Sequence, residues 1–221
     1  MAREARTYDE LWRSKLEIPP RAVPLRFSAA VEGLRPGRRV LDIGCGQGLG
    51  HELLAPDFAE VHGVDGTEAA LERARARGTR VARVDLEAEA LPYPDAHFDA
   101  ILCLDVVEHL VDPARLVREI ARMLQPGGQA VVTTPNARSI RQLARIALAG
   151  RGPRTSGDDF GVDGGHLHYF TSRDVAELLE RAGLRVVERR GLWNRLENRH
   201  LARRWLVREL LSGGVLLRAT R

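Results

Sequence analysis

The sequence has little that marks a disulfide-stabilised, zinc-binding or membrane-spanning protein. Only two of its 221 residues are cysteines, Cys45 and Cys103, and both stand in apolar runs without a second cysteine at metal-ligand spacing. No stretch approaches the roughly 18 uncharged apolar residues that a membrane-spanning helix needs. The first ten residues mix arginine with glutamate and lack the apolar core of a secretory signal. These absences favour a globular cytoplasmic enzyme whose cysteines are small buried side chains.

Lysine is nearly absent as well, since Lys15 is the only one and arginine supplies the other side-chain cations. Such a bias is typical of genome composition, so the net charge of +4 does not by itself indicate a nucleic-acid partner. The positive charge is uneven, because the segment 189–208 alone holds seven arginines. The interleaved apolar residues of 192–211 predict a basic amphipathic helix. We expect it either to pack on the sheet edge with its arginines reaching solvent, or to contact a membrane surface or an anionic substrate.

Short apolar stretches alternate with helical patterns from residue 38 onward, which predicts β-α-β units and a mostly parallel sheet. We expect a doubly wound α/β fold, with helices on both faces of a seven-stranded sheet, in a single domain of residues 1–221. The expected strands are 39–43, 61–65, 80–86, 98–104, 129–134, 184–190 and 215–220, and the expected helices include 67–77, 113–124, 139–149 and 171–182.

Within this single domain we expect four parts. They are residues 1–36, 37–135, 136–170 and 171–221. In the first part, Tyr8 and Trp12 lie one helical turn apart, on one face of an expected helix.

The strongest local signal follows the first expected strand, where Asp42 precedes glycines at positions 44, 46 and 48. Glycines let the backbone turn sharply and approach a ligand closely at a helix N-terminus. Asp65 ends the second expected strand, where a carboxylate can accept both hydroxyls of a ribose. A dinucleotide fingerprint would need a third glycine at position 49 or 51, which are leucine and histidine. The spacing therefore disfavours a nicotinamide oxidoreductase and favours S-adenosylmethionine as the nucleoside cofactor.

With these residues, the sequence resembles the class I S-adenosylmethionine-dependent methyltransferases, particularly the small-molecule group that includes the ubiquinone-biosynthesis O-methyltransferases. The resemblance covers nearly the whole chain. It is carried by the ordered motifs 40–48 (VLDIGCGQG), 63–65 (GVD), 84–86 (VDL), 104–110 (LDVVEHL), 124–128 (LQPGG), 134–136 (TPN) and 168–171 (HYFT). It implies that residues 1–36 form a helical lid, 37–135 the cofactor-binding half, 136–170 a substrate loop and 171–221 the C-terminal half. In the lid, Tyr8 and Trp12 either line the site or dock the extension through an apolar face.

The resemblance implies a set of cofactor-binding residues. Asp85 would bind the exocyclic amine of adenine and Leu86 would donate its backbone amide to the ring, while Leu104 and Asp105 would touch the methionine portion. Asp42 would orient the loop and the cofactor's ammonium group. The full implied set is Tyr8, Asp42, Gly44, Cys45, Gly46, Gly48, Asp65, Gly66, Asp85, Leu86, Leu104 and Asp105.

Transfer of a methyl group to a hydroxyl also requires a base, and three histidines are candidates: His109, His166 and His168. His168 is our first choice because it follows the variable loop. Each histidine also has a structural interpretation, as a cap, as packing beneath the cofactor or as an anchor for the loop. Glu108, His109 and the later histidines form a possible divalent-metal site, but few carboxylates are available and the sequence favours no metal.

The sequence thus predicts methyl transfer from S-adenosylmethionine to a small molecule, with O-methylation favoured and the acceptor, lipid-linked or glycosylated, left open. N-methylation and a non-catalytic methyltransferase-like binding module remain alternatives, and the oligomeric state is open.

Overall fold

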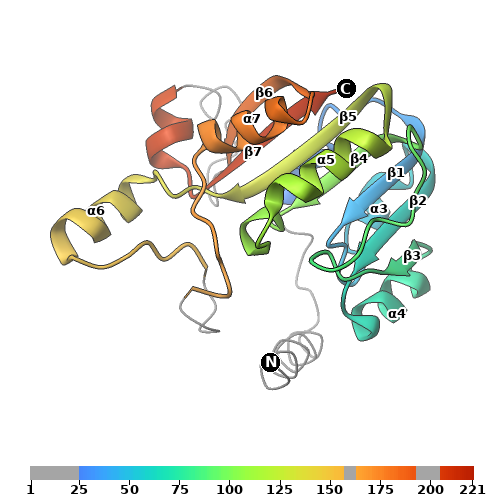
Figure 1. Ribbon diagram of the computed structural model, residues 1–221, viewed down its shortest axis with the longest axis horizontal. Coiled ribbons are helices and arrows are strands. Elements are labelled where there is room, and N and C mark those ends of the chain that lie inside the picture. The colour runs from blue at the N-terminus through green and yellow to red at the C-terminus, as the bar shows by residue number, and fades with distance from the viewer. Residues whose placement is uncertain (1–24, 157–162, 193–204) are drawn as a thin grey trace.

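The computed structural model describes residues 25–156, 163–192 and 205–221 (Figure 1). The expectations for Tyr8 and Trp12, and most of the expected helix 192–211, lie outside these residues. No helix in the described part of the chain is both long and apolar enough to span a bilayer.

One seven-stranded sheet organises the described chain, in the order β3-β2-β1-β4-β5-β7-β6. Neighbouring strands from β3 through β5 pair in parallel, whereas β7 pairs antiparallel with both β5 and β6. The strands are β1 (Gly37–Ile43), β2 (Phe58–Asp65), β3 (Arg80–Arg83), β4 (Phe98–Leu104), β5 (Leu124–Pro135), β6 (Arg185–Leu192) and β7 (Gly214–Thr220). The parallel strands bring the residues after β1, β2 and β4 to one edge of the sheet, where such folds bind ligands.

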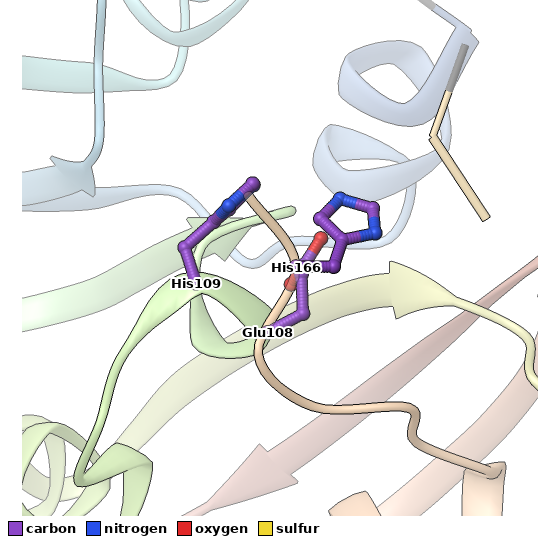
Figure 2. Close-up of side chains that lie close together, drawn as sticks. All are labelled: Glu108, His109 and His166. Carbon is purple, nitrogen blue, oxygen red and sulfur yellow. The ribbon is translucent and has the colours of Figure 1, made fainter. Parts of the chain in front are cut away.

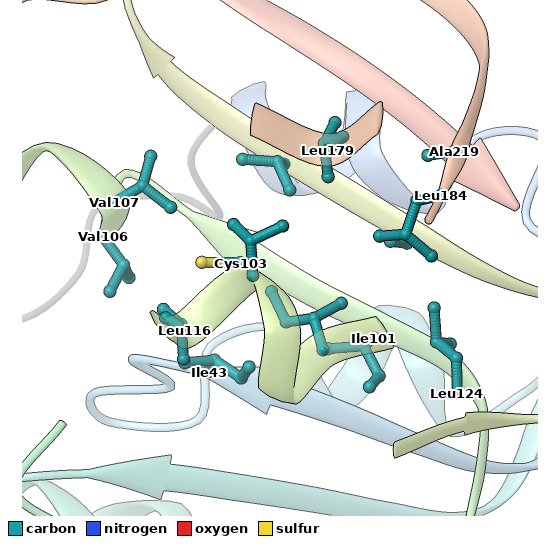
Figure 3. Close-up of a cluster of buried hydrophobic side chains, with 14 of the residues drawn as sticks. Ile43, Ile101, Cys103, Val106, Val107, Leu116, Leu124, Leu179, Leu184 and Ala219 are labelled. Atoms are coloured by element: carbon teal, nitrogen blue, oxygen red, sulfur yellow. The ribbon is translucent and has the colours of Figure 1, made fainter. Parts of the chain in front are cut away.

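Two apolar clusters cover the two faces of the sheet, because alternate strand residues point to opposite sides. Leu41 and Ile43 of β1 pack in the cluster that includes α5 (Pro113–Met123) and α7 (Ser172–Arg181), part of which is shown in Figure 3. Val40 packs in the other cluster, with α2 (Leu25–Val31) and α3 (His51–Leu54). Asp42 alternates with Leu41 and Ile43, so it lies on the α2 side of the sheet.

The remaining helices differ in how they join this body. The helix α4 (Glu68–Ala76) lies beside β2 and β3. In contrast, α6 (Ile140–Ala149) extends away from the sheet (Figure 1). Two short turns complete the described elements, η1 (Val107–His109) and η2 (Val207–Leu211).

The predicted fold is confirmed, with corrections at element boundaries. The third strand ends at Arg83, and Asp65 accepts the next backbone N–H, that of Val84, as the chain leaves the sheet. The fifth strand begins at Leu124 and not at 129, because the Pro-Gly-Gly segment forms an irregularity within the pairing with β4. Leu192 belongs to β6 and pairs with Gly214, so the expected basic helix does not begin there.

Arg218 of β7 fastens α2 to the sheet. Its side chain is nearly buried, with its Nη2 donating to the carbonyls of Glu32 at 2.5 Å and Ala30 at 3.4 Å. Its Nε lies 3.4 Å from the Glu188 carboxylate. Residues at the end of α2 are therefore tied to a central antiparallel strand.

We expect Arg218→Met to lower the free energy of unfolding by about 2–4 kcal/mol, because it removes the charged donor that the carbonyls of Ala30 and Glu32 bind and the ion pair with Glu188. Urea unfolding followed by circular dichroism measures the change. Arg173→Met is the matched control, since the Arg173 side chain is 84% exposed. Equal stability of the two variants would contradict this assignment.

Candidate active site

The loop after β1 is shaped by left-handed backbone at its glycines. Gly46 has a φ of +50°, and a Cβ added there would meet no atom within 4 Å. Gly48 has a φ of +70°, and its added Cβ would lie 2.9 Å from Ala74 of α4. An L-residue would be strained at both positions. Gly48 therefore allows the loop to pack on α4, whereas Gly46 leaves an open side that a ligand can approach.

Asp65 joins this loop to the end of β2. One carboxylate oxygen accepts the N–H of Gly46 at 3.0 Å and the other accepts the N–H of Thr67 at 2.9 Å. Burial raises the pKa of Asp65, and the backbone hydrogen bonds oppose that rise. Each oxygen has a second lone pair, so the carboxylate can still accept hydroxyl donors from a ligand.

A group of acidic side chains lies at and just beyond the carboxyl ends of β1 and β4. Asp42 is buried, and its desolvation together with the nearby Asp65 charge raises its pKa to about 7. Asp105 has a φ of +57° and accepts a hydrogen bond from Thr133 Oγ1 at 2.7 Å. The pKa of buried Glu108 is raised to about 8 by desolvation and by Asp105.

Arg26 of α2 reaches this acidic group with its positive charge. Its Nε lies 3.3 Å from Asp105 Oδ2, and its charge lowers the pKa values of Asp42 and Glu108. Its Nε is buried without a hydrogen bond of good geometry. Sequence reasoning missed Arg26, because no motif distinguishes it among the many arginines.

Two of the predicted histidines meet beside Glu108. Figure 2 shows Glu108 and His109 on the segment after β4 and His166 reaching them from a loop distant in sequence. The His109 and His166 rings lie 4.6 Å apart between centroids. Each of these three residues offers one potential ligand atom, and the three atoms lie within 4.8 Å of one another. This set could hold a divalent cation, although three protein ligands would leave most of its coordination to water or substrate.

Hydrogen bonds decide which histidine nitrogen is basic. His109 Nδ1 lies 3.2 Å from the carbonyl oxygen of Gly165. Because a carbonyl only accepts, Nδ1 of a neutral His109 carries the hydrogen and Nε2 carries the lone pair.

His166 has the same tautomer for a different reason. Thr155 Oγ1 donates to Asp163 Oδ2 at 2.8 Å, so it accepts from His166 Nδ1 at 2.7 Å. Burial alone would raise the pKa of Asp163, but hydrogen bonds from Thr155 and Ser156 outweigh it and lower that pKa. Asp163, Thr155 and His166 thus form a relay ending in an ionised carboxylate. Sequence reasoning missed Thr155 and Asp163, which stand in no recognisable motif.

His168 lies nearby in a different setting. Its backbone N–H donates to the carbonyl of Glu108 at 3.1 Å, and its ring stacks against Phe170 at 5.5 Å. Its Nε2 is buried and has no hydrogen-bond partner among the described residues. The structure therefore brings His168 close to the backbone of Glu108, but anchors its ring less firmly than that of His166.

The residues expected at the adenine end lie after β3. Asp85 is exposed and accepts the N–H of Glu87 at 2.9 Å, and the Leu86 carbonyl accepts a hydrogen bond from Arg115. Gly66 is exposed next to Asp65, whereas Cys45 and Leu104 are buried. Burial and nearby carboxylates raise the pKa of the Cys45 thiol, so it does not act as a nucleophile. The ligand contacts of these residues remain predictions.

We expect Asp42→Asn to stabilise the protein by on the order of 2 kcal/mol at pH 8 and to change little at pH 4. The folded pKa of Asp42, about 7, lies above the unfolded value of 3.8. Stability therefore falls as pH rises through this window, because folding opposes ionisation, and asparagine removes that loss. Thermal unfolding across pH measures the difference, with exposed Asp57→Asn as control. An advantage that is independent of pH would refute this cause.

Comparisons with known proteins agree with this arrangement. The sequence profile of the methyltransferase domain family matches residues 12–189. A probable S-adenosylmethionine-dependent methyltransferase of Mycolicibacterium smegmatis is 36% identical over 72% of this chain and 56% of its own length. A ubiquinone biosynthesis O-methyltransferase of Ruegeria pomeroyi is 33% identical over 80% of this chain and 73% of its own length.

The fold leads to the same family. The crystal structure of an S-adenosylmethionine-dependent methyltransferase from Mesorhizobium loti superimposes with a TM-score of 0.69 and 25% identity, covering 90% of this chain and 98% of that one. The chain spans about half the length of several curated relatives that it matches. On its sequence, its fold and its glycine loop, the chain belongs to the S-adenosylmethionine-dependent methyltransferases.

Proposed function

We propose that the chain transfers the methyl group of S-adenosylmethionine to a hydroxyl of a small molecule, with a histidine as the base. The observation that carries the proposal is the relay from Asp163 through Thr155 to His166, which ends beside Glu108 at the ligand edge of the sheet. A relay of this kind holds an imidazole in one tautomer and stabilises it once protonated.

The residues at this edge fit the methyl donor. Its methionine part carries both an ammonium and a carboxylate, and the described edge offers Asp42 and Asp105 for the first and Arg26 for the second. Asp65 suits the ribose hydroxyls, and the open side of Gly46 gives room for close approach. Bound there, S-adenosylmethionine supplies an electrophilic methyl group on a sulfonium.

The protein's own part is to orient the acceptor and to remove its proton. His166 accepts the hydroxyl proton at Nε2, while its Nδ1–H stays bonded to Thr155. The charge that develops on the ring is stabilised through Thr155 by Asp163, whose carboxylate also lies 3.6 Å from Nδ1. His109 and His168 remain candidates for the same role, and the anchored ring favours His166.

The alternatives predict different results. An N-methyltransferase needs no base for an amine that enters uncharged, so the histidines would be dispensable. A cation held by Glu108, His109 and His166 would lower the pKa of the acceptor itself, and a chelator would abolish turnover. A non-catalytic module would bind S-adenosylhomocysteine and turn over nothing.

Cofactor binding is the first test. We expect Asp65→Ala to weaken S-adenosylhomocysteine binding by about 2–3 kcal/mol, the range for losing charge-assisted hydrogen bonds, without unfolding the protein. Isothermal titration calorimetry measures it, with exposed Asp57→Ala as the matched control. Tight NAD binding and no response to S-adenosylhomocysteine would overturn the assignment.

The base is the second test. We expect His166→Gln to lower turnover by about 10²–10⁴ while S-adenosylhomocysteine affinity stays within a few-fold. Formation of S-adenosylhomocysteine is followed with a panel of catechols, phenols, alcohols and primary amines, with and without EDTA. His109→Gln and His168→Gln serve as parallel variants. Near-normal turnover in all three would show that transfer depends on positioning alone.

A further inference from the structure

The helix α6 exposes its apolar side chains and buries a polar one, the opposite of an ordinary surface helix. Four large apolar side chains face solvent, with exposures of 57% for Ile140, 42% for Leu143, 47% for Ile146 and 86% for Leu148. The one buried side chain of α6 is the polar Gln142. A surface helix normally buries its apolar stripe and exposes its polar one, so this helix presents an apolar face that the described residues leave largely uncovered.

The positions of the side chains around the helix axis explain why the apolar ones are exposed. Ile140, Leu143 and Ala147 repeat at the i, i+3, i+7 spacing of one face. Gln142 lies away from that face, where its amide donates to the Arg154 carbonyl at 2.5 Å and accepts the Arg154 N–H at 2.9 Å. The polar side thus fastens α6 to the following loop, and the apolar side points outward.

The segment that carries this face has charged side chains of one sign. The segment 136–157 contains five arginines and no acidic residue. At its start, Arg138 lies 5.5 Å above the ring of Trp205, which is itself 52% exposed and followed by Leu206 at 58%. An apolar helical face bordered by arginines, with a tryptophan beside it, complements the acyl boundary and the anionic headgroups of a bilayer.

The position of α6 suits this occupant. The helix extends away from the body of the fold (Figure 1), so it can enter a planar surface before the sheet does. A protein partner would more commonly offer acids at fixed positions, whereas arginines spread along one segment match a surface of uniform negative charge.

We propose that α6 docks on an anionic lipid surface, with Ile140, Leu143, Ile146 and Leu148 entering the bilayer interface and Arg141 facing the headgroups. The docking rests on the proposed function in one respect, since it suits an acceptor carried in a membrane. Arg154, held by Gln142 of α6, directly precedes Thr155, the residue that anchors His166. Contact between α6 and the membrane is thereby linked to the segment that holds the base.

The test is co-sedimentation of the full chain with vesicles of phosphatidylcholine alone or mixed three to one with phosphatidylglycerol. We expect binding to the mixed vesicles that weakens with added salt, and little binding to phosphatidylcholine alone. The double substitution Ile146→Ser with Leu148→Ser should weaken binding at least about tenfold, and Arg141→Gln a few-fold. Val111→Ser is the matched control, because Val111 is 73% exposed outside α6.

Two results would overturn the proposal. One is equal vesicle binding by the α6 double variant and the Val111 control. The other is no vesicle binding together with self-association that the double variant abolishes, which would make α6 a contact between copies. Calorimetry with S-adenosylhomocysteine and turnover with water-dispersed acceptors are measured on the same variants. Vesicle binding without turnover would reject the proposed reaction and leave the docking intact.

Discussion

The crowding of carboxyl groups at one edge of a parallel sheet is the constraint on which this site depends. The β-α-β topology brings the carboxyl ends of β1, β2 and β4 together, and an acid lies at or next to each of them: Asp42, Asp65 and Asp105. Burial and mutual repulsion oppose ionisation of Asp42 and Glu108. Arg26 is held against this edge by its ion pair with Asp105, and Arg218 ties the end of its helix to β7. A ligand with an ammonium group relieves the same repulsion. The free energy that this repulsion costs the folded protein is then partly recovered when the ligand binds.

Whether a structural feature could be predicted from the sequence depends on how few neighbouring residues determine it. The glycine loop and Asp65 could be read from the sequence because backbone conformation and strand ends are encoded within a few residues. The boundaries of β5 could not, because pairing with β4 extends the strand through the Pro-Gly-Gly segment. Arg26 was missed because its role arises from packing α2 across the sheet onto acids far along the chain.

The same reasoning explains the histidines. Their residue type marked them as candidates for the base, but the sequence favoured His168 from its place after the variable loop. What distinguishes His166 is a hydroxyl eleven residues earlier and a carboxylate three residues earlier, which the loop folds together. A relay of this kind has no periodicity and no fixed spacing, so only the folded loop reveals it.

The two acids nearest His166 differ in protonation because their environments differ. This difference determines which ring nitrogen of the histidine faces a negative charge. Asp163 accepts three hydrogen bonds that lower its pKa, so it is ionised at neutral pH. For Glu108, desolvation and the nearby Asp105 charge outweigh the hydrogen bonds from its own backbone N–H and from Thr134 and raise its pKa to about 8, so it is mostly protonated there. The negative charge therefore lies on the Nδ1 side of His166 and not beside Glu108. Opposed environments for two acids are typical of sites that move a proton, because the environment and not the residue type sets the role of each acid. In the proposed reaction, a proton accepted at Nε2 would place the new positive charge on a ring whose other nitrogen already faces an anion through Thr155. The same contact would orient the imidazole before transfer and stabilise it afterwards.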